Sequence, residues 1–346
     1  MTLPLVSICI PNYNYERYIG NCIESVISQT YSNIEIVVTD NCSNDNSVPV
    51  AKSYADHVRV YQNKENIGMI RNFNAAFDHA NGEYVVFLSS DDVLGHEFID
   101  KTVSIMENYP NVGFVITAND EIDHYGNIQK VAPFYHCNCI VPKEIQLPVF
   151  AMTGIGFPSQ ILIRSDIFRK IGGYDLRYSH FFDWHLNFKC ALYSDMGYVA
   201  EKLMLYRRHN EHSTWNSIKT MKQSFEYYLM LDDIFALSEQ FNQYRVLARR
   251  EEAFNRIGDM SLKYAMLILN NANYQNGDLD IVKKYLKLAQ VFNLKITESD
   301  IFQLLQSNVY CDEFRIADFR RSIIEKGLSS IVRSKSFEPP EGYIKV

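Results

Sequence analysis

Near the amino terminus, four short apolar segments each end in a cluster of small polar residues. The segments are LVSICI, IEIVVT, VRVY and YVVFL, and the clusters that follow them are 12–14, 40–41, 63–66 and 89–92. Between the first two segments, apolar residues recur at helical spacing, at Ile19, Ile23, Val26 and Ile27. A strand, helix, strand succession with continuously apolar strands predicts a parallel sheet covered by helices on both faces. Because ligands bind at the carboxyl ends of such strands, we expect the four clusters to form one site.

Size, charge and cysteine content exclude several classes of protein. The chain has 346 residues, of which 47% are hydrophobic, so it can bury a large core and is expected to form two or three domains. Its net charge of -7 argues against a nucleic-acid partner. The seven cysteines include no CxxC pair, which favours reduced thiols in a cytosolic protein over a disulfide framework. No signal peptide is expected at the amino terminus, and no apolar run reaches the roughly 18 residues of a transmembrane helix.

Beyond the fourth segment, the pattern predicts more α/β structure and then helices alone. Strands are expected at 112–118 and 159–164, and a helix is expected over 183–193. From about Ser217 onward only helical spacing remains, as in LARREEAFNRIGDMSLKYAMLIL. We therefore predict an α/β domain over 1–215, an α-helical domain over 216–336 and a disordered tail over 337–346.

Several motifs of the chain resemble those of glycosyltransferase family 2. They are VSICIPNYNYERYIGNCIESVISQTYSNIEIVVTDNCSNDNS, NIGMIRNFNAAFDHANGEYVVFLSSDD, GGYD, FFDWHL and YRRH, in the order that the family has them. The resemblance covers roughly residues 4–214 and implies a GT-A fold, which is Rossmann-like with a mostly parallel central sheet. It also implies a transferase that moves a sugar from a nucleotide-sugar donor to a hydroxyl, as in bacterial surface polysaccharide or glycolipid synthesis. Inversion at the anomeric carbon is inferred from the family and from the single proposed base.

The resemblance places one set of residues against the donor: Pro11, Tyr13, Asn14, Asp40, Asn66, Gly68, Arg71, Ser90, Asp91 and Asp92. The Tyr13 ring can stack on a base, although turn chemistry alone also explains its polar neighbours. Asp40 can accept a hydrogen bond from a base, or it can close an Asx-turn or cap a helix. Arg71 suits a phosphate, and a surface arginine at the start of a helix is the equal alternative.

Asp91 and Asp92 are the predicted metal ligands. When a nucleoside diphosphate leaves, negative charge develops that a divalent cation can neutralise, and Mn2+ or Mg2+ prefers carboxylate and phosphate oxygens. Family members often have a further aspartate where this chain has Ser89, which leaves Asp91 as the main candidate and Asp92 to assist or orient it. The structural alternative is that Asp92 caps a helix that starts near Gly95.

His209, in YRRHNEHS, matches a histidine that the family carries near the metal or diphosphate. Neutral imidazole can bind manganese and imidazolium can offset phosphate charge, and His212 could substitute for His209. The neighbouring Tyr206, Arg207 and Arg208 are expected to contribute positive charge to the same mouth.

Asp183 is the predicted general base. The family places an aspartate at the amino end of a helix after a GG turn, usually after a glutamate, which is Phe182 in this chain. A carboxylate can take the proton of an acceptor hydroxyl as the hydroxyl attacks, and a helix-capping role before Trp184 is compatible with this. The acceptor side is expected at Gly154, Gly156 and Trp184, because glycine permits close backbone approach.

The segment 314–335 interleaves apolar and basic residues. It is typical either of a helix on anionic lipid or of a capping helix in a bundle with solvated charges. We expect a cytoplasmic protein that acts on a glycan or lipid-linked acceptor, and we leave open peripheral contact with the inner face of the membrane and self-association.

Two other functions compete with sugar transfer. A sugar nucleotidyltransferase needs a GxGxR phosphate loop, which IPNYNYERY lacks. A noncatalytic nucleotide-binding scaffold that acts through its helical domain is favoured by Ser89 and Phe182, the two departures from the family pattern.

Overall fold

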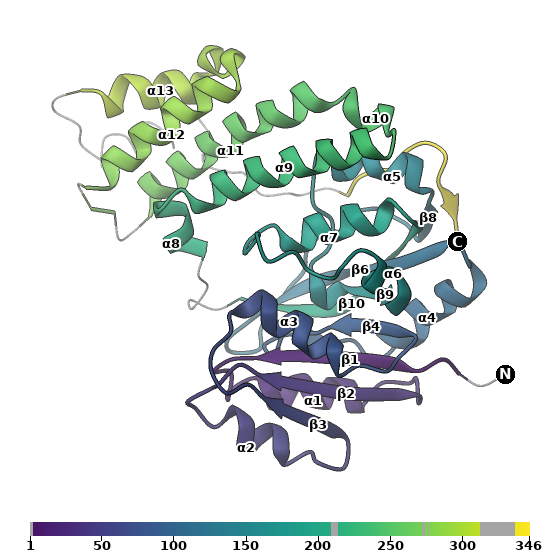
Figure 1. The fold of residues 1–346 in the computed structure, drawn as a ribbon. Helices are drawn as coiled ribbons and strands as arrows, with labels where there is room; N and C mark the ends of the chain where they lie inside the picture. Colours follow the sequence, from purple (N-terminus) through teal and green to yellow (C-terminus); the bar gives the residue numbers. More distant parts are fainter. Residues whose placement is uncertain (1–2, 209–213, 272–273, 276, 312–335) are drawn as a thin grey trace. The chain divides into compact units, whose positions relative to one another are not determined.

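The computed structural model describes residues 3–208, 214–271, 274–275, 277–311 and 336–346. By its internal contacts the chain divides into two compact units, Met1–Asn210 with Ser334–Val346 and Glu211–Arg333. The first unit is α/β and the second is α-helical (Figure 1). The division lies a few residues before the boundary that the sequence predicts near Trp215.

One mixed sheet of 11 strands organises the first unit. Four parallel neighbours lie at one side in the order β3-β2-β1-β4, namely β3 (Val58–Gln62), β2 (Ile34–Asp40), β1 (Val6–Asn12) and β4 (Tyr84–Phe87). The sheet continues with β9 (Ile161–Arg164), antiparallel to both neighbours, then β6 (Val112–Asp123) and its parallel partner β10 (Asp195–Arg208). Every residue of β1 and β4 is buried, as expected for strands covered on both faces. The predicted α/β class with a mostly parallel sheet is confirmed.

Helices cover both faces of this sheet (Figure 1). One core contains residues of α1 (Ile19–Ile27), α2 (Ser47–Lys52) and α4 (Phe98–Asn108), together with Val86 of β4. The next residue of β4, Phe87, lies 6.1 Å from Phe73 of α3 (Met69–Asp78) and 4.8 Å from Phe168 of α6 (Ser165–Lys170), between ring centroids. Because successive strand residues point to opposite faces, α3 and α6 cover the second face.

Short elements complete the first unit. They are β5 (Val93–Leu94), β7 (Ile128–Gln129), β8 (Cys139–Val141), α5 (Lys143–Phe150), the 3-10 helix η1 (Pro158–Gln160) and α7 (Phe182–Ala191). The strand expected at 159–164 begins only at Ile161, because Pro158 starts η1 instead. The strand expected at 112–118 continues to Asp123, and a turn then joins it to its antiparallel partner β7.

Residues 336–346, which the sequence suggested were disordered, pair with the sheet. β11 (Ile344–Lys345) is antiparallel to β8, and the backbone N–H of Phe337 donates to the carbonyl of Phe134 at 2.7 Å. The outer edge of β8 offers unpaired backbone groups that satisfy this segment, and its polar composition does not reveal such a partner. The structure therefore differs from the expected disorder.

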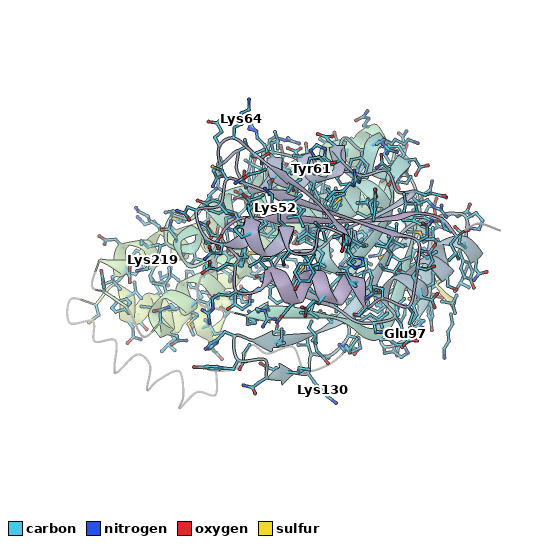
Figure 2. All side chains as sticks on the ribbon, turned by 90° about the horizontal axis from the view of Figure 1, so that it is seen from below. Lys52, Tyr61, Lys64, Glu97, Lys130 and Lys219 are labelled. Carbon is cyan, nitrogen blue, oxygen red and sulfur yellow. The ribbon has the colours of Figure 1, made fainter. Side chains whose placement is uncertain are left out.

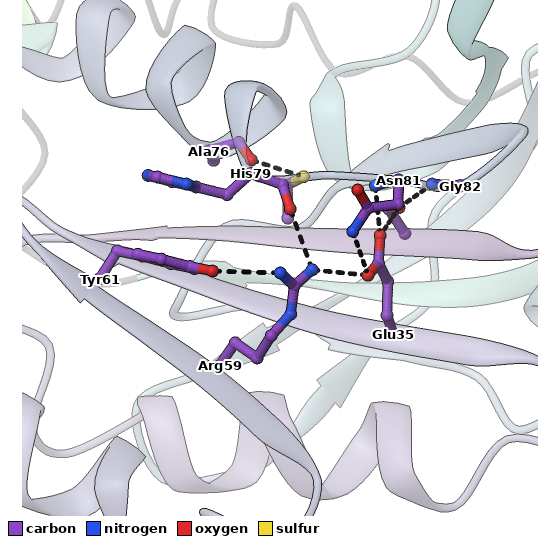
Figure 3. A network of polar contacts seen from close by, with 9 residues as sticks. Glu35, Arg59, Tyr61, Ala76, His79, Asn81 and Gly82 are labelled. Carbon is purple, nitrogen blue, oxygen red and sulfur yellow. Dashed lines mark hydrogen bonds and ion pairs between the residues drawn. The ribbon is translucent and has the colours of Figure 1, made fainter.

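A polar network joins the amino ends of the parallel strands, at the edge opposite to the four polar clusters (Figure 3). Glu35 accepts three hydrogen bonds of 2.5 Å each. The donors are Ser7 Oγ, the backbone N–H of Asn81 and the guanidinium of Arg59. Arg59 also donates to the carbonyl of His79 at 2.9 Å. Burial raises the pKa of Glu35, but the hydrogen bonds from Ser7 and Asn81 and the charge of Arg59 outweigh it, so the net effect lowers the pKa of Glu35 from its ordinary value.

The second unit is a set of helices with its own core. Its elements are α8 (Thr214–Lys219), α9 (Lys222–Gln240), α10 (Tyr244–Leu247), α11 (Arg250–Asn270), α12 (Asp278–Phe292), η2 (Leu294–Glu298) and α13 (Asp300–Val309). Gly258 lets α11 approach α12 closely, since a Cβ there would lie 2.8 Å from the carbonyl oxygen of Ala289. Tyr285 fastens α12 to α8 by donating its hydroxyl to the carbonyl of Ile218 at 2.7 Å. None of the helices in the described ranges is both long enough and apolar enough to cross a bilayer.

Candidate active site

Polar side chains join the carboxyl ends of β1 and β2. Asn12 Nδ2 donates to Asp40 Oδ1 at 2.7 Å, and Asp40 Oδ2 accepts the backbone N–H of Ser43 at 2.9 Å. The Ser43 hydroxyl donates to Asp40 Oδ1 at 2.5 Å, and Asp40 is only 1% exposed. Asp40 therefore closes a turn after β2, which is one of the alternatives for this residue, and its contact with a base stays a prediction.

Asn41 connects the second polar cluster to the third. Its Oδ1 accepts from the backbone N–H of Ile67 at 2.9 Å and from Asn63 Nδ2 at 3.2 Å, and its Nδ2 donates to Asn66 Oδ1 at 2.8 Å. Asn66 Oδ1 also accepts the N–H of Gly68 at 2.9 Å, and Gly68 has a φ of +88° just before α3 begins. The buried Asn41 amide thus shapes the loop that leads into α3, a role that the sequence analysis did not assign.

The residues predicted to meet the donor differ in exposure. Tyr13 is 43% exposed, as a ring that stacks on a base would need to be, and Arg71 is exposed on the first turn of α3. Asn14 has a φ of +59° and is held by Ser43 Oγ, which accepts its N–H at 2.9 Å. Pro11 is buried, and its carbonyl accepts a hydrogen bond from Ser90 Oγ at 2.8 Å, which ties the first cluster to the fourth. Lys64, in the loop after β3, extends into solvent (Figure 2).

Asp92 is the more deeply held of the two adjacent acids. Its Oδ2 accepts from Ser159 Oγ at 2.6 Å and its Oδ1 from the backbone N–H of Arg207 at 2.9 Å. Burial and then the charge of Asp91 raise the pKa of Asp92 well above its ordinary value, against the opposing effect of those hydrogen bonds. The helix expected to start near Gly95 is α4, which starts at Phe98, so Asp92 does not cap it.

Arg207 holds the backbone of the acidic loop, residues 89–92, in place. It is 4% exposed, and its guanidinium donates to the carbonyls of Asp91 at 2.7 Å and Asp123 at 3.1 Å. Its Cζ lies 4.7 Å from the centroid of the Tyr18 ring, a cation–π distance. The sequence predicts only a general positive charge for Arg207, but its guanidinium donates to two carbonyls and lies against an aromatic ring.

The neighbours of Arg207 contribute in different ways. Arg208 pairs with Glu121 at 2.7 Å, and the Tyr206 ring centroid lies 4.7 Å from that of Phe157. Burial and the charges of the acidic pair raise the pKa of Tyr206 to about 12. The predicted ligand His209 and its alternative His212 lie outside the described residues.

Asp183 lies in the first turn of α7, which begins at Phe182 after Phe181 as N-cap. Its Oδ1 accepts the backbone N–H of Trp184 at 2.7 Å, so it binds a helix N-terminus without being the cap. Burial raises the pKa of Asp183 from 3.8 to about 6, although backbone hydrogen bonds oppose the rise. The carboxylate of an acid with this pKa is ionised near neutral pH, can accept a proton and is a stronger base than an ordinary aspartate.

Contacts between α3 and the GGYD turn hold the start of α7 in place. Asn74 of α3 donates to the carbonyl of Tyr174 at 2.8 Å and accepts its N–H at 3.0 Å. The rings of Phe73 and Phe182 lie 5.7 Å apart. The helix that carries Asp183 is thus packed against the helix that follows the third polar cluster.

The predicted acceptor-side residues form a loop supported by α7. A Cβ on Gly154 would lie 3.2 Å from the ring of Trp184, and Trp184 is itself 8% exposed. Gly156 has a φ of +75°, and a Cβ there would lie 2.8 Å from Ile116 Cγ2. Asn187 Nδ2 donates to the carbonyl of Ile155 at 2.8 Å. Trp184 therefore packs against the glycine loop, and only a small part of its ring is exposed for contact with an acceptor.

The acidic pair fits a hard divalent cation. Two carboxylates on one loop are the oxygen donors that Mn2+ or Mg2+ prefers, and a bound cation would relieve their mutual repulsion. Asp91 is 7% exposed and Asp92 1% exposed, so Asp91 is the carboxylate nearer to solvent. Asp91 and Asp92 are the described residues that would hold the cation.

Comparison with known proteins identifies the family. A model of Glycosyl transferase family 2 matches residues 7–172. An uncharacterized glycosyltransferase of Rickettsia prowazekii (strain Madrid E) is 31% identical over 229 residues, which cover 64% of this chain and 69% of that protein. The chain therefore belongs to glycosyltransferase family 2 and is a glycosyltransferase, as its motifs predict.

Two solved structures share the fold. S. aureus TarS 1–349 in complex with UDP-GlcNAc has a TM-score of 0.55 at 18% identity, with 99% of each chain covered. The mannosyltransferase PcManGT from Pyrobaculum calidifontis, in complex with GDP-Man and Mn2+, has a TM-score of 0.51 at 14% identity, with 95% of this chain and 88% of that chain covered. The likeness confirms the predicted GT-A fold followed by helices.

Proposed function

We propose that this glycosyltransferase moves a sugar from a nucleotide-sugar donor to a hydroxyl acceptor and inverts the anomeric carbon. The observation that carries the proposal is the presence of two kinds of carboxylate in one unit. The buried pair Asp91 and Asp92 follows β4, and Asp183, with a pKa of about 6, lies in the first turn of α7. Relatives of the same fold that bind UDP-GlcNAc or GDP-Man support a nucleotide sugar as the donor.

The donor is proposed to lie along the carboxyl ends of β1 to β4. The exposed ring of Tyr13 offers a stacking surface for the base, and Asn66, Gly68 and Arg71 belong to the loop after β3 and the first turn of α3. The diphosphate is assigned to the acidic loop, where Asp91 and Asp92 would hold Mn2+ or Mg2+. A bound cation there supplies Lewis-acid neutralisation of the charge that develops on the leaving diphosphate.

Asp183 is proposed to act as the base in a single displacement. Its carboxylate takes the proton of the acceptor hydroxyl, the acceptor oxygen bonds to the anomeric carbon, and the nucleoside diphosphate leaves with the electron pair of the broken bond. One displacement inverts the anomeric carbon. The Gly154–Phe157 loop, which packs on the same helix, is the proposed acceptor side.

The proposed acceptor is a hydroxyl of a glycan or lipid-linked sugar in surface polysaccharide or glycolipid synthesis. The proposed location is the cytoplasm, at or near the inner face of the membrane. All seven cysteines are free thiols, which supports a reducing compartment.

A thermal-shift panel tests donor binding. UDP, GDP, dTDP and CMP are each added with and without Mn2+, because a ligand that binds the native state at 100 times its Kd adds about 2.7 kcal/mol to the free energy of unfolding. We expect one nucleoside diphosphate to raise Tm in a manganese-dependent way. No shift with any of the four would contradict the proposal.

Proton NMR of the first product formed from an α-linked donor tests inversion. A β-linked product is expected. An α-linked product would mean that the configuration is retained and would exclude the single in-line displacement.

A further inference from the structure

Ser159 makes two polar contacts with the acidic loop. Its hydroxyl donates to Asp92 Oδ2 at 2.6 Å and accepts the backbone N–H of Ser89 at 3.0 Å. Ser159 is completely buried, so water does not compete for either contact. The hydroxyl therefore holds both the first and the last residue of the SSDD motif.

The element that carries Ser159 is fastened to the sheet. Gln160 Nε2 donates to the carbonyl of Thr117 on β6 at 2.7 Å, and Gln160 Oε1 accepts the N–H of Phe157 at 3.2 Å. These contacts link the two ends of η1 and attach it to β6. The position of the Ser159 hydroxyl is thus set by a rigid support.

The same short segment reaches the acceptor side. The glycine loop that enters η1 packs on β6 at Gly156 and accepts a hydrogen bond from Asn187 of α7 at the carbonyl of Ile155. Residues 154–160 therefore contact the acidic loop at one end and, at the other, the helix that carries Asp183 in its first turn.

We propose that Ser159 is a positioning residue that orients Asp92 and the 89–92 loop, and thereby Asp91, for the cation and diphosphate of the donor. It does so from the segment that forms the acceptor side, so both halves of the site share one support. This inference rests on the proposed function. It concerns the chain's own residues, since Ser159 contacts the carboxylate and the loop backbone and not the donor.

Loss of the hydroxyl has a definite physical consequence. Without it, Asp92 Oδ2 loses a donor and the N–H of Ser89 loses an acceptor, and both groups lie where unpaired polar atoms are costly. Asp92 Oδ1 stays bound to the backbone N–H of Arg207, and Ser90 Oγ still donates to the carbonyl of Pro11, so the loop remains attached and the fold is expected to persist. Removing a residue that orients a metal ligand typically lowers metal affinity or activity by about 10–100-fold.

The test compares Ser159→Ala with Ser165→Ala. Ser165 follows β9 at its other end, is 2% exposed and donates to the carbonyl of Gly82 at 2.7 Å. Its replacement removes an equally buried hydroxyl far from the acidic loop. Calorimetry with UDP, GDP, dTDP and CMP, each with and without MnCl2, measures binding, and thermal unfolding measures stability.

We expect Ser159→Ala to weaken manganese-dependent diphosphate binding by about tenfold or more and Ser165→Ala to change it less than twofold. Ser159→Cys, which keeps a weaker donor and fills the space, should fall between wild type and Ser159→Ala, and it carries the test if the alanine variant does not fold.

Equal binding by wild type and the Ser159 variants would overturn the inference alone. An equal loss of affinity in Ser159→Ala and Ser165→Ala, following their loss of stability, would also overturn it, because that pattern is purely structural. If wild type binds none of UDP, GDP, dTDP and CMP with Mn2+, the proposed function fails, and that outcome is distinct from the other two.

Discussion

Replacing Asp183 by asparagine should stabilise the protein while it abolishes most of the activity. Asparagine keeps the size of the side chain and an oxygen that accepts the N–H of Trp184, as Asp183 Oδ1 does at 2.7 Å. It removes the carboxylate that burial disfavours. The variant should therefore be more stable and less active than wild type. This is expected when the ionised form of a catalytic group destabilises the native state.

The magnitude follows from the pKa. Folding raises the pKa of Asp183 from 3.8 to about 6, so the native state binds the proton more tightly than the unfolded state does. A raised pKa adds no penalty below the unfolded value, and the native state loses stability as pH increases through the folded value. At about 1.4 kcal/mol per pKa unit, the penalty at pH 8 is at most about 3 kcal/mol, and about half of it is present at pH 5. Solvent access to the side chain reduces both figures.

Thermal unfolding of wild type and Asp183→Asn at pH 5 and pH 8 checks this sign. We expect the variant to melt several degrees higher at pH 8, with a smaller advantage at pH 5. Transfer should fall by about 10²–10⁴-fold, and the wild-type rate should rise with pH through about 6 as the base loses its proton.

Asp166→Asn is the matched control for this experiment. Asp166 lies in the first turn of α6 and accepts the N–H of the next residue at 2.7 Å, but it is exposed. Its replacement should change Tm by no more than about a degree, and it should leave the rate of sugar transfer unchanged. An Asp183→Asn variant that is no more stable than wild type at pH 8, or that transfers sugar at the wild-type rate, would refute the reasoning.

Three further predictions concern other parts of the chain. Asp91→Asn should abolish manganese-dependent diphosphate binding without lowering Tm, and calorimetry that shows unchanged affinity would contradict the metal assignment. Glu35→Gln should lower the free energy of unfolding by about 1–2 kcal/mol at pH 7, because it weakens the hydrogen bonds that Glu35 accepts from Arg59 and the other donors of the network. Since the pKa of Glu35 is lowered by folding, this cost should shrink as pH falls below about 4, and a pH-independent difference in unfolding would refute the ionic account. Truncation near residue 314 should remove salt-sensitive sedimentation with anionic vesicles, whereas equal sedimentation of both forms would favour a capping helix.

The fold was largely predictable from the sequence because each strand carries its own signal. The apolar runs at β1, β2 and β4 are buried along most of their length, and such runs occur in parallel strands covered on both faces. The tail at 336–346 was not predictable, because its order depends on the backbone edge of β8, which local composition does not encode.

The candidate site divides in the same way. Asp183 could be placed near a helix start because GGYD and FFDWHL are local patterns, and the structure puts it in the first turn of α7. The contact between Asp92 and Arg207 joins residues 115 positions apart, and the contact between Asp92 and Ser159 joins residues 67 apart. Contacts at such separations depend on the register of β10 and the placement of η1, so neither could be inferred from a motif.

Release of nucleoside diphosphate from a panel of UDP- and GDP-sugars, with Mn2+ present and water or a simple sugar as acceptor, tests the central claim most directly. The account predicts that wild type releases diphosphate from at least one donor and that Asp91→Asn and Asp183→Asn each reduce the rate by at least about 100-fold. Release by wild type that both variants retain in full would place the chemistry elsewhere in the chain. No release from any of these donors, with no manganese-dependent binding of UDP, GDP, dTDP or CMP, would contradict nucleotide-sugar transfer itself.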